Sequence, residues 1–172
     1  CVLIDFKGGL GAQGLSDLPH LAGVLTDLQP GSLHRVHGGV VAEIARREHL
    51  LATHAVASVS ELPDTVRCSR VIIAVDEVGV VVDSAPSFGP LLADIAARGR
   101  SLGMHLIVSG QRLTSQVPRG VLVNAGLRWC LGVTDPTEAT EYLPGVPASE
   151  ISSLQTASPG TVIGLALGYQ HY

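Results

Sequence analysis

Two adjacent carboxylates, Asp76 and Glu77, follow the apolar run VIIAV at residues 71–75. Such a β-branched run predicts a buried strand of a parallel sheet, and ligands of α/β sheets bind at the carboxyl ends of the strands. At that place Asp76 can hold Mg²⁺ through water beside nucleotide phosphates, and Glu77 can orient or deprotonate an attacking water. The alternative is a strand that ends in two solvated acids, and the pair alone does not decide between the two.

A glutamine, Gln111, follows a second apolar run at residues 106–108. Parallel strands present their carboxyl ends at one edge of a sheet, so we expect Gln111 near Asp76 and Glu77. There its side chain can contact a γ-phosphate or the attacking water and report the state of the nucleotide to the next segment. The alternative is a glutamine that simply begins a loop.

Strand and helix patterns alternate along all 172 residues, which we interpret as a single domain. Strand patterns occupy residues 2–6, 22–25, 71–75, 106–108, 127–133 and 161–167. Helical patterns begin at Ser32 and cover residues 90–102 and 136–143. This alternation predicts an α/β fold of three layers, in which helices cover both faces of a mostly parallel sheet.

The composition limits the partners that this chain can bind by itself. The net charge is −4 and there is one lysine, which argues against an autonomous nucleic-acid-binding surface. We interpret the arginine pairs at 46–47 and 98–100 as solvated charges on helices. The three cysteines form no CxxC pair, which favours a reduced, cytosolic protein. No apolar run reaches the roughly 18 residues that a membrane span needs.

Several motifs together resemble the FtsK/SpoIIIE-type translocase ATPases. They are VLIDFKGG at residues 2–9, VDE at 75–77, RGRSLGMHLIVSGQR at 98–112 and SPG at 158–160. The sequence resembles most the EccC-type ATPase modules of type VII secretion, through LPH at 18–20 and a following helix with Glu43, Arg46 and Arg47. The resemblance covers nearly the whole chain in the same order, and it implies a RecA-like (P-loop NTPase) fold.

The resemblance also implies roles for particular residues. It makes Asp76 and Glu77 a Walker B pair and Gln111 the sensor glutamine. It places Asp5 and Lys7 in the DxK motif at the end of a strand that borders the nucleotide.

Arg128 is the position that the resemblance favours for an arginine acting on the nucleotide of a neighbouring subunit. A second family arginine of that region is replaced here by Gly132.

The activity that the resemblance implies is hydrolysis of Mg²⁺-ATP, coupled to moving a polymer through a ring of subunits. The cofactors are then ATP and Mg²⁺, and the polymer is either DNA or a secreted protein. We expect a cytoplasmic location at the inner face of the membrane, through a region outside this chain. A second hypothesis is a degenerate, non-hydrolysing module that binds substrate peptides or neighbouring subunits.

A Walker A loop, GxxxxGK followed by Ser or Thr, does not occur in the sequence. That loop supplies the backbone N–H groups and the lysine that hold the phosphates, so we expect the chain to begin after it, or to have lost it. The resemblance to RecA-like folds places the strand that leads into this loop between the strands at 71–75 and 106–108, so we expect a gap between these two that another segment fills. Direct pairing of the two strands would instead favour the degenerate module.

The glycines at residues 9–14 fit GxGxxG, the dinucleotide-binding fingerprint, and NAD binding is a remote alternative. A true fingerprint opens a helix, whereas Ser16, Asp17 and Pro19 follow here within a turn. The acid expected about 20 residues further on is also missing, since Asp27 comes early and in a turn. The glycines more readily explain tight turns.

Overall fold

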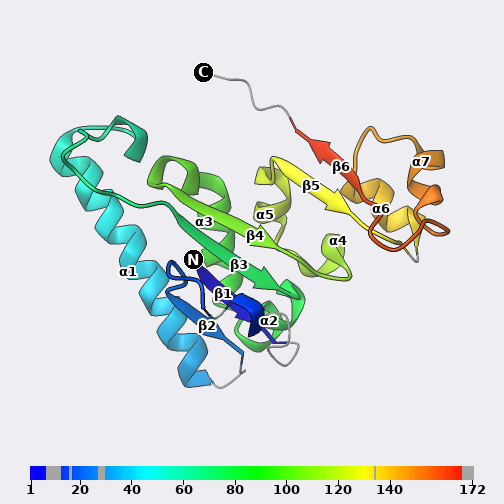
Figure 1. Cartoon of the computed structure of the whole chain (residues 1–172), viewed down its shortest axis with the longest axis horizontal. Coiled ribbons are helices and arrows are strands. Elements are labelled where there is room, and N and C mark those ends of the chain that lie inside the picture. Colours follow the sequence, from blue (N-terminus) through cyan, green and yellow to red (C-terminus); the bar gives the residue numbers. More distant parts are fainter. Residues whose placement is uncertain (7–12, 16, 27–29, 134, 168–172) are drawn as a thin grey trace.

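The structure is a computed structural model, and it describes residues 1–6, 13–15, 17–26, 30–133 and 135–167. Its strands and helices are close to those that the sequence predicts, with additional short helices (Figure 1). In chain order they are β1 (Val2–Asp5), β2 (Gly23–Leu25), α1 (Pro30–His54), β3 (Val71–Asp76), α2 (Val78–Ser84), α3 (Phe88–Leu102), β4 (Met104–Val108), α4 (Leu113–Gln116), α5 (Arg119–Asn124), β5 (Leu127–Cys130), α6 (Pro136–Tyr142), α7 (Ala148–Ser153) and β6 (Ile163–Ala166). In the described residues no helix combines the length and the apolar character that crossing a membrane requires.

Four of the strands form one parallel sheet in the order β2-β1-β3-β4. Strands β3 and β4 pair directly, from Val71 opposite Met104 to Val75 opposite Val108. Backbone hydrogen bonds continue this ladder at both ends. The N–H of Val71 donates to the carbonyl oxygen of Gly103, and the N–H of Ser109 donates to the carbonyl oxygen of Val75, each at 2.9 Å. The expected gap between these two strands is therefore wrong. Strand β4 lies at the edge of the described sheet instead.

One face of the parallel sheet packs against α1, α2 and α3 and forms the main core. Strand residues of this face, among them Ile4, Ile73 and Met104, are almost completely buried. They pack with side chains from the helices, including Leu33, Val40, Ile44, Val78, Val81, Leu92 and Ile95. The apolar pattern of the strands therefore produces the α/β packing that the sequence predicts.

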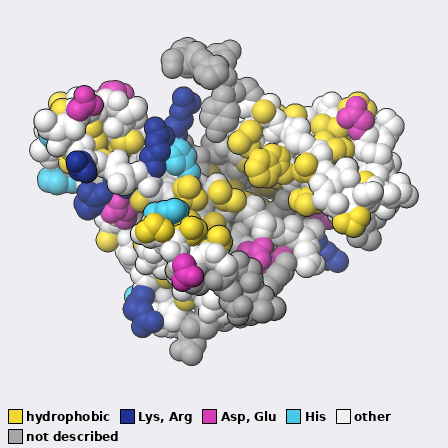
Figure 2. Space-filling model, in the orientation of Figure 1, with side chains coloured by type: hydrophobic (Ala, Val, Ile, Leu, Met, Phe, Trp, Pro, Cys, Tyr) yellow, Lys and Arg dark blue, Asp and Glu magenta, His cyan; other side chains and the backbone are white. Residues whose placement is uncertain are grey.

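The opposite face of the sheet carries a row of apolar residues outside this core. Paired positions place Val24, Leu3, Ala74 and Ile107 side by side across the four strands. The side chain of Ile107, on the edge strand β4, is 57% exposed. In Figure 2 hydrophobic side chains gather over the sheet. The described residues thus supply a helical layer on one face, whereas the sequence predicts helices on both faces.

Strands β5 and β6 form a separate antiparallel two-stranded sheet, with Trp129 opposite Gly164. One side of this small sheet packs on α6 and α7 around a second core of Ala139, Leu143 and Ile151. Its other side is open, since Trp129 is 66% exposed. The sequence predicts both strands, but their antiparallel pairing is a finding of the structure.

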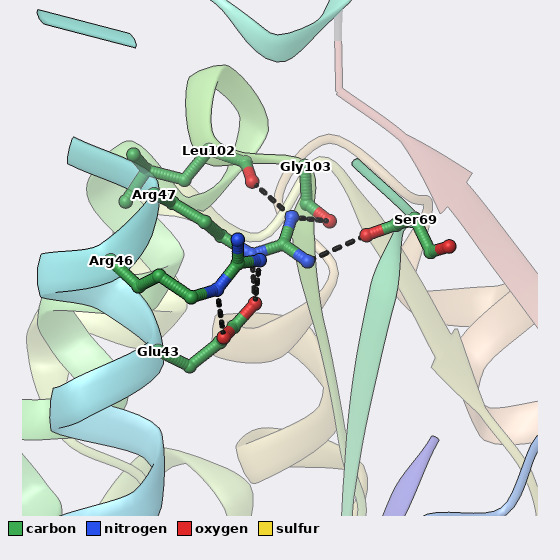
Figure 3. Close-up of polar contacts among 6 residues, drawn as sticks. All are labelled: Glu43, Arg46, Arg47, Ser69, Leu102 and Gly103. Atoms are coloured by element: carbon green, nitrogen blue, oxygen red, sulfur yellow. Dashed lines mark hydrogen bonds and ion pairs between the residues drawn. The ribbon is translucent and has the colours of Figure 1, made fainter. Parts of the chain in front are cut away.

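Arg47 joins α1 to the starts of β3 and β4 (Figure 3). Its guanidinium donates hydrogen bonds to Glu43, to the carbonyl oxygens of Leu102 and Ser69, each at 2.6 Å, and more weakly to that of Gly103. Only 2% of Arg47 is exposed, so its interpretation as a solvated charge is wrong. Its neighbour Arg46 does lie at the surface and pairs with the same carboxylate.

Candidate functional site

The carboxyl ends of β1 and β3 bring Asp5 and Asp76 together. The two aspartates are directly paired positions of the parallel ladder, which places both at the same edge of the sheet. Asp5 is buried, with 4% of its surface exposed, and Asp76 is half-buried. The strands at residues 2–5 and 71–76 therefore deliver two acidic residues to one edge of the sheet.

Glu77 turns the chain from β3 into α2. Its backbone is left-handed, with φ 51° and ψ 61°, a conformation that side-chain-bearing residues adopt at a cost of about 1–3 kcal/mol. Its carboxylate is buried and accepts a hydrogen bond from the backbone N–H of Gln111 at 3.1 Å. The segment after β4 therefore holds the second acid in place.

The hydroxyl of Ser109 donates a short hydrogen bond to Oδ1 of Asp76. Ser109 directly follows β4, just as Asp76 ends β3, so the parallel ladder brings the two side chains together. Sequence analysis missed this contact. The available signal was the position of Ser109 directly after an apolar run and two residues before Gln111.

A cavity of about 440 Å³ opens beside Glu77. It is lined by Phe6, Glu77, Val80, Gln111, Arg112 and Gln116. The structure thus brings Gln111 to the acids, as expected, and adds Arg112 and Gln116 to the same cavity. A water in this cavity would have a carboxylate, an amide and a cationic side chain along its walls, which are the groups that a hydrolytic site needs.

A larger cavity, of about 970 Å³, lies between the segment after β4 and the β5–α6 region. Gln111 and Arg112 line it on one side, and Trp129, Leu131 and Tyr142 line it on the other. The same two residues therefore stand between the two cavities. Cys130 also borders the larger cavity, and burial raises the pKa of its thiol, which favours the protonated, unreactive form.

Arg128 lies away from the acids, on β5. Its guanidinium donates to the carbonyl oxygens of Leu122, at 2.6 Å, and Tyr142, at 2.9 Å, and lies 5.7 Å from the ring centre of Tyr142. These bonds connect β5 to α5 and α6 within the same chain. Lys7 lies outside the described residues, as do most of the glycines at 9–14.

The donor chemistry at the carboxyl end of β3 fits Mg²⁺. This ion takes hard oxygen ligands and is usually held by one or two carboxylates together with phosphates and several waters. Asp76 supplies a carboxylate of this kind at the end of β3, and it is half-buried. Across the described ranges no group of three or more His, Cys, Asp or Glu side chains gathers as a metal site. The residues that would hold Mg²⁺ here are Asp76 and, through the paired position, Asp5.

No protein-family model matches the chain, but known proteins are similar to it in sequence. The chain is 30% identical over 152 residues to the ESX-4 secretion system protein EccC4 of Mycobacterium tuberculosis, an alignment that covers 83% of this chain and 12% of that protein.

Two solved structures of a type VII secretion ATPase, EccC of Thermomonospora curvata, are similar to the chain. Its cytoplasmic domain has a TM-score of 0.81 at 28% identity, covering 96% of this chain and 20% of that one. ATPases 2 and 3 of EccC, in complex with a signal sequence peptide, have a TM-score of 0.72 at 23% identity, covering 96% and 30%. At 23% identity, the similarity to this second structure shows a shared fold only. The chain thus spans a small part of the length of these relatives.

The parallel sheet and its flanking helices have the α/β, RecA-like fold of type VII secretion ATPase domains, with the acids at the carboxyl edge of the sheet. The homologues of the chain are the type VII secretion ATPases of the EccC kind, so the resemblance carried by the motifs is confirmed.

Proposed function

We propose that this chain forms the Walker B and sensor part of a Mg²⁺-ATP-hydrolysing motor that moves secreted proteins. The observation that carries the proposal is the contact between the ends of β3 and β4, where Ser109 and Gln111 hold Asp76 and Glu77. Asp76 holds the metal through water, with Asp5 beside it. Mg²⁺, when bound, neutralises the charge that develops on the transferred phosphoryl group.

Glu77 accepts the proton of the attacking water in this proposal. Its buried carboxylate borders the 440 Å³ cavity, so a water there can reach it without crossing the core. Gln111 holds that carboxylate through its backbone and lines the same cavity with its side chain. A change at the γ-phosphate would therefore reach both the base and the segment that follows Gln111.

Nucleotide binding then needs a phosphate loop, which these 172 residues do not contain. We propose that the strand leading into this loop pairs with the outer edge of β4. Strand β4 ends the described sheet, Ile107 on it is exposed, and the 970 Å³ cavity beside Gln111 gives the loop room next to the acids. Hydrogen exchange tests this arrangement: the amides of β4 should exchange more slowly in a longer protein with the loop than in this chain. Equal exchange rates in the two would contradict it.

We assign a polypeptide rather than DNA as the cargo. The net charge of −4 does not suit a nucleic-acid surface, and a structure of the T. curvata relative holds a signal sequence peptide. Assembly into a ring and attachment to the cytoplasmic side of a membrane, both through contacts outside this chain, belong to the same proposal. The test is ATP turnover by the longer protein with added signal sequence peptide or duplex DNA. Stimulation by DNA alone would overturn the assignment of the cargo.

A second candidate function is a non-hydrolysing module that binds peptides or neighbouring subunits. Two observations favour it: β3 and β4 pair directly without a strand between them, and Arg128 is engaged by carbonyls of its own chain. This candidate predicts peptide binding that neither ATP nor Mg²⁺ alters. Titrating a fluorescent signal sequence peptide with and without Mg²⁺-ATP distinguishes it from the motor.

A further inference from the structure

The first residue after β4, Ser109, is fixed to the end of β3 by its backbone. Its N–H donates to the carbonyl oxygen of Val75 and its carbonyl oxygen accepts from the N–H of Val78, both at 2.9 Å. These two bonds bracket Asp76 and Glu77. The position of Ser109 relative to Asp76 is therefore set by the ladder rather than by a free loop.

The side chain of Ser109 adds a third connection, because its hydroxyl donates to Oδ1 of Asp76. Within the described part of the chain this is the side chain that hydrogen-bonds to Asp76. Without such a donor, an aspartate carboxylate can rotate about its terminal side-chain torsion. The residue paired with Asp76 on the neighbouring strand is a second acid, Asp5. A hydroxyl donor lowers the freedom of the carboxylate and leaves Oδ2 to face a metal-bound water.

We infer that Ser109 is a positioning residue for Mg²⁺: its hydroxyl fixes the orientation in which Asp76 accepts hydrogen bonds from metal-bound water. The inference rests on the proposed Mg²⁺-ATP function of this site. Loss of an outer hydrogen-bond partner of a metal-binding group typically costs about 10- to 100-fold in metal affinity. Since Asp76 acts through water, we expect the lower end, about tenfold.

The test uses a protein that joins this chain to a phosphate loop, with ATPγS, and Mn²⁺ as a paramagnetic probe for Mg²⁺. Electron paramagnetic resonance measures free Mn²⁺ and gives the affinity of the nucleotide-loaded site for the metal. Ser109→Ala should weaken Mn²⁺ binding about tenfold, and Ser109→Thr, which keeps a hydroxyl, should restore most of it. Nucleotide binding in EDTA should be equal in the parent and both variants.

The matched control is Ser101→Ala, which removes a hydroxyl that donates to the carbonyl oxygen of Arg98 at the end of α3, near the start of β4 and so at the edge of the sheet opposite the acids. This variant should bind Mn²⁺ like the parent, and thermal melting shows that all variants are folded. Unchanged Mn²⁺ affinity in Ser109→Ala, or equal weakening by the threonine variant, overturns the inference.

Asp76→Ala separates this inference from the proposal beneath it. If Asp76→Ala abolishes metal-dependent binding while Ser109→Ala has no effect, the role of Ser109 is wrong and the site stands. If the parent and Asp76→Ala bind Mn²⁺ equally, the assignment of the metal site itself is wrong, and the role of Ser109 fails with it.

Discussion

The Nη2 atom of Arg47 lies 2.6 Å from the carbonyl oxygen of Ser69, two residues before β3 begins. The Nη1 atom of the same guanidinium lies 2.6 Å from the carbonyl oxygen of Leu102, two residues before β4 begins. One side chain of α1 therefore connects the starts of the two strands whose other ends carry the acids and the sensor segment. This contact lies at the edge of the sheet opposite the site.

Replacing Arg47 by Met should destabilise the fold by roughly 3–5 kcal/mol, because a buried charge network loses its central partner and leaves carbonyl groups unsatisfied. Urea denaturation measures the change in the free energy of unfolding. The control is Arg46→Met, which removes the surface arginine from the same carboxylate, Glu43, and should cost less than about 1 kcal/mol. Equal losses in the two variants would show that the carbonyl contacts of Arg47 contribute little.

The carboxylate of Glu43 should make stability depend on pH. Its pKa is lowered from 4.5 to about 2, chiefly by the hydrogen bond from Arg46 and further by Arg47. Because the folded-state pKa is depressed, the stabilisation is present above pH 4.5 and is lost as the pH falls towards 2.

The measurement for Glu43 is the free energy of unfolding in urea at several values of pH. Between pH 4.5 and 2 the parent should lose stability more steeply than Glu43→Gln, in which this titration is absent. Glu141→Gln, at an exposed position of α6, should follow the parent. Parallel curves for the parent and Glu43→Gln would contradict the lowered pKa.

The sequence was sufficient for the parts of the site that depend on local pattern. Apolar runs predicted the strands, and the residue after each run predicted what reaches the edge of the sheet, so Asp76, Glu77 and Gln111 were found together. The order of the strands in the sheet could not be predicted in this way, because strand pairing depends on contacts between segments that are distant in the sequence. This is why the expected gap between β3 and β4 was wrong.

Local sequence propensity also failed to predict the structure where tertiary packing determines it. Residues 78–84 form α2 although three valines stand in a row, because Val78 and Val81 are completely buried against the main core. Arg47 was expected in solvent because its sequence neighbour Arg46 is. The two differ in the face of α1 on which they lie, and only one face meets the carbonyls of Leu102 and Ser69.

Two helical glycines should respond to alanine with opposite signs. At Gly99 an added Cβ would lie 2.4 Å from the carbonyl oxygen of Met104, so α3 and β4 would have to separate, at a cost of roughly 1–3 kcal/mol or more. At Gly38 in α1 an added Cβ meets nothing within 4 Å, so alanine should stabilise the helix by about 0.5–1 kcal/mol. Thermal melting of both variants checks the prediction. Destabilisation of equal size at both positions would contradict it.

The 172-residue chain by itself should neither bind Mg²⁺-ATP tightly nor hydrolyse it. The phosphate loop and its lysine normally provide most of the electrostatic grip on the phosphates, and the sequence contains neither. Calorimetry measures binding and a phosphate-release assay measures turnover, after circular dichroism has shown a folded α/β protein. Micromolar affinity with turnover near one per second would mean that the chain contains a phosphate site of another kind.

In a protein that joins this chain to a phosphate loop, Glu77→Gln should abolish hydrolysis and leave nucleotide binding nearly intact. The amide keeps the shape of the side chain and can still accept the N–H of Gln111, but it cannot take a proton from water. Loss of a general base typically lowers the rate by about 10²- to 10⁴-fold.

Asp76→Ala should act differently and weaken nucleotide binding only when Mg²⁺ is present. Turnover and equilibrium binding are measured side by side with and without EDTA, and Glu150→Gln, at an exposed position of α7, serves as the control. Parental turnover in Glu77→Gln would refute the Walker B assignment, whereas a shared loss of binding in both variants would indicate that the two acids act together in holding the metal.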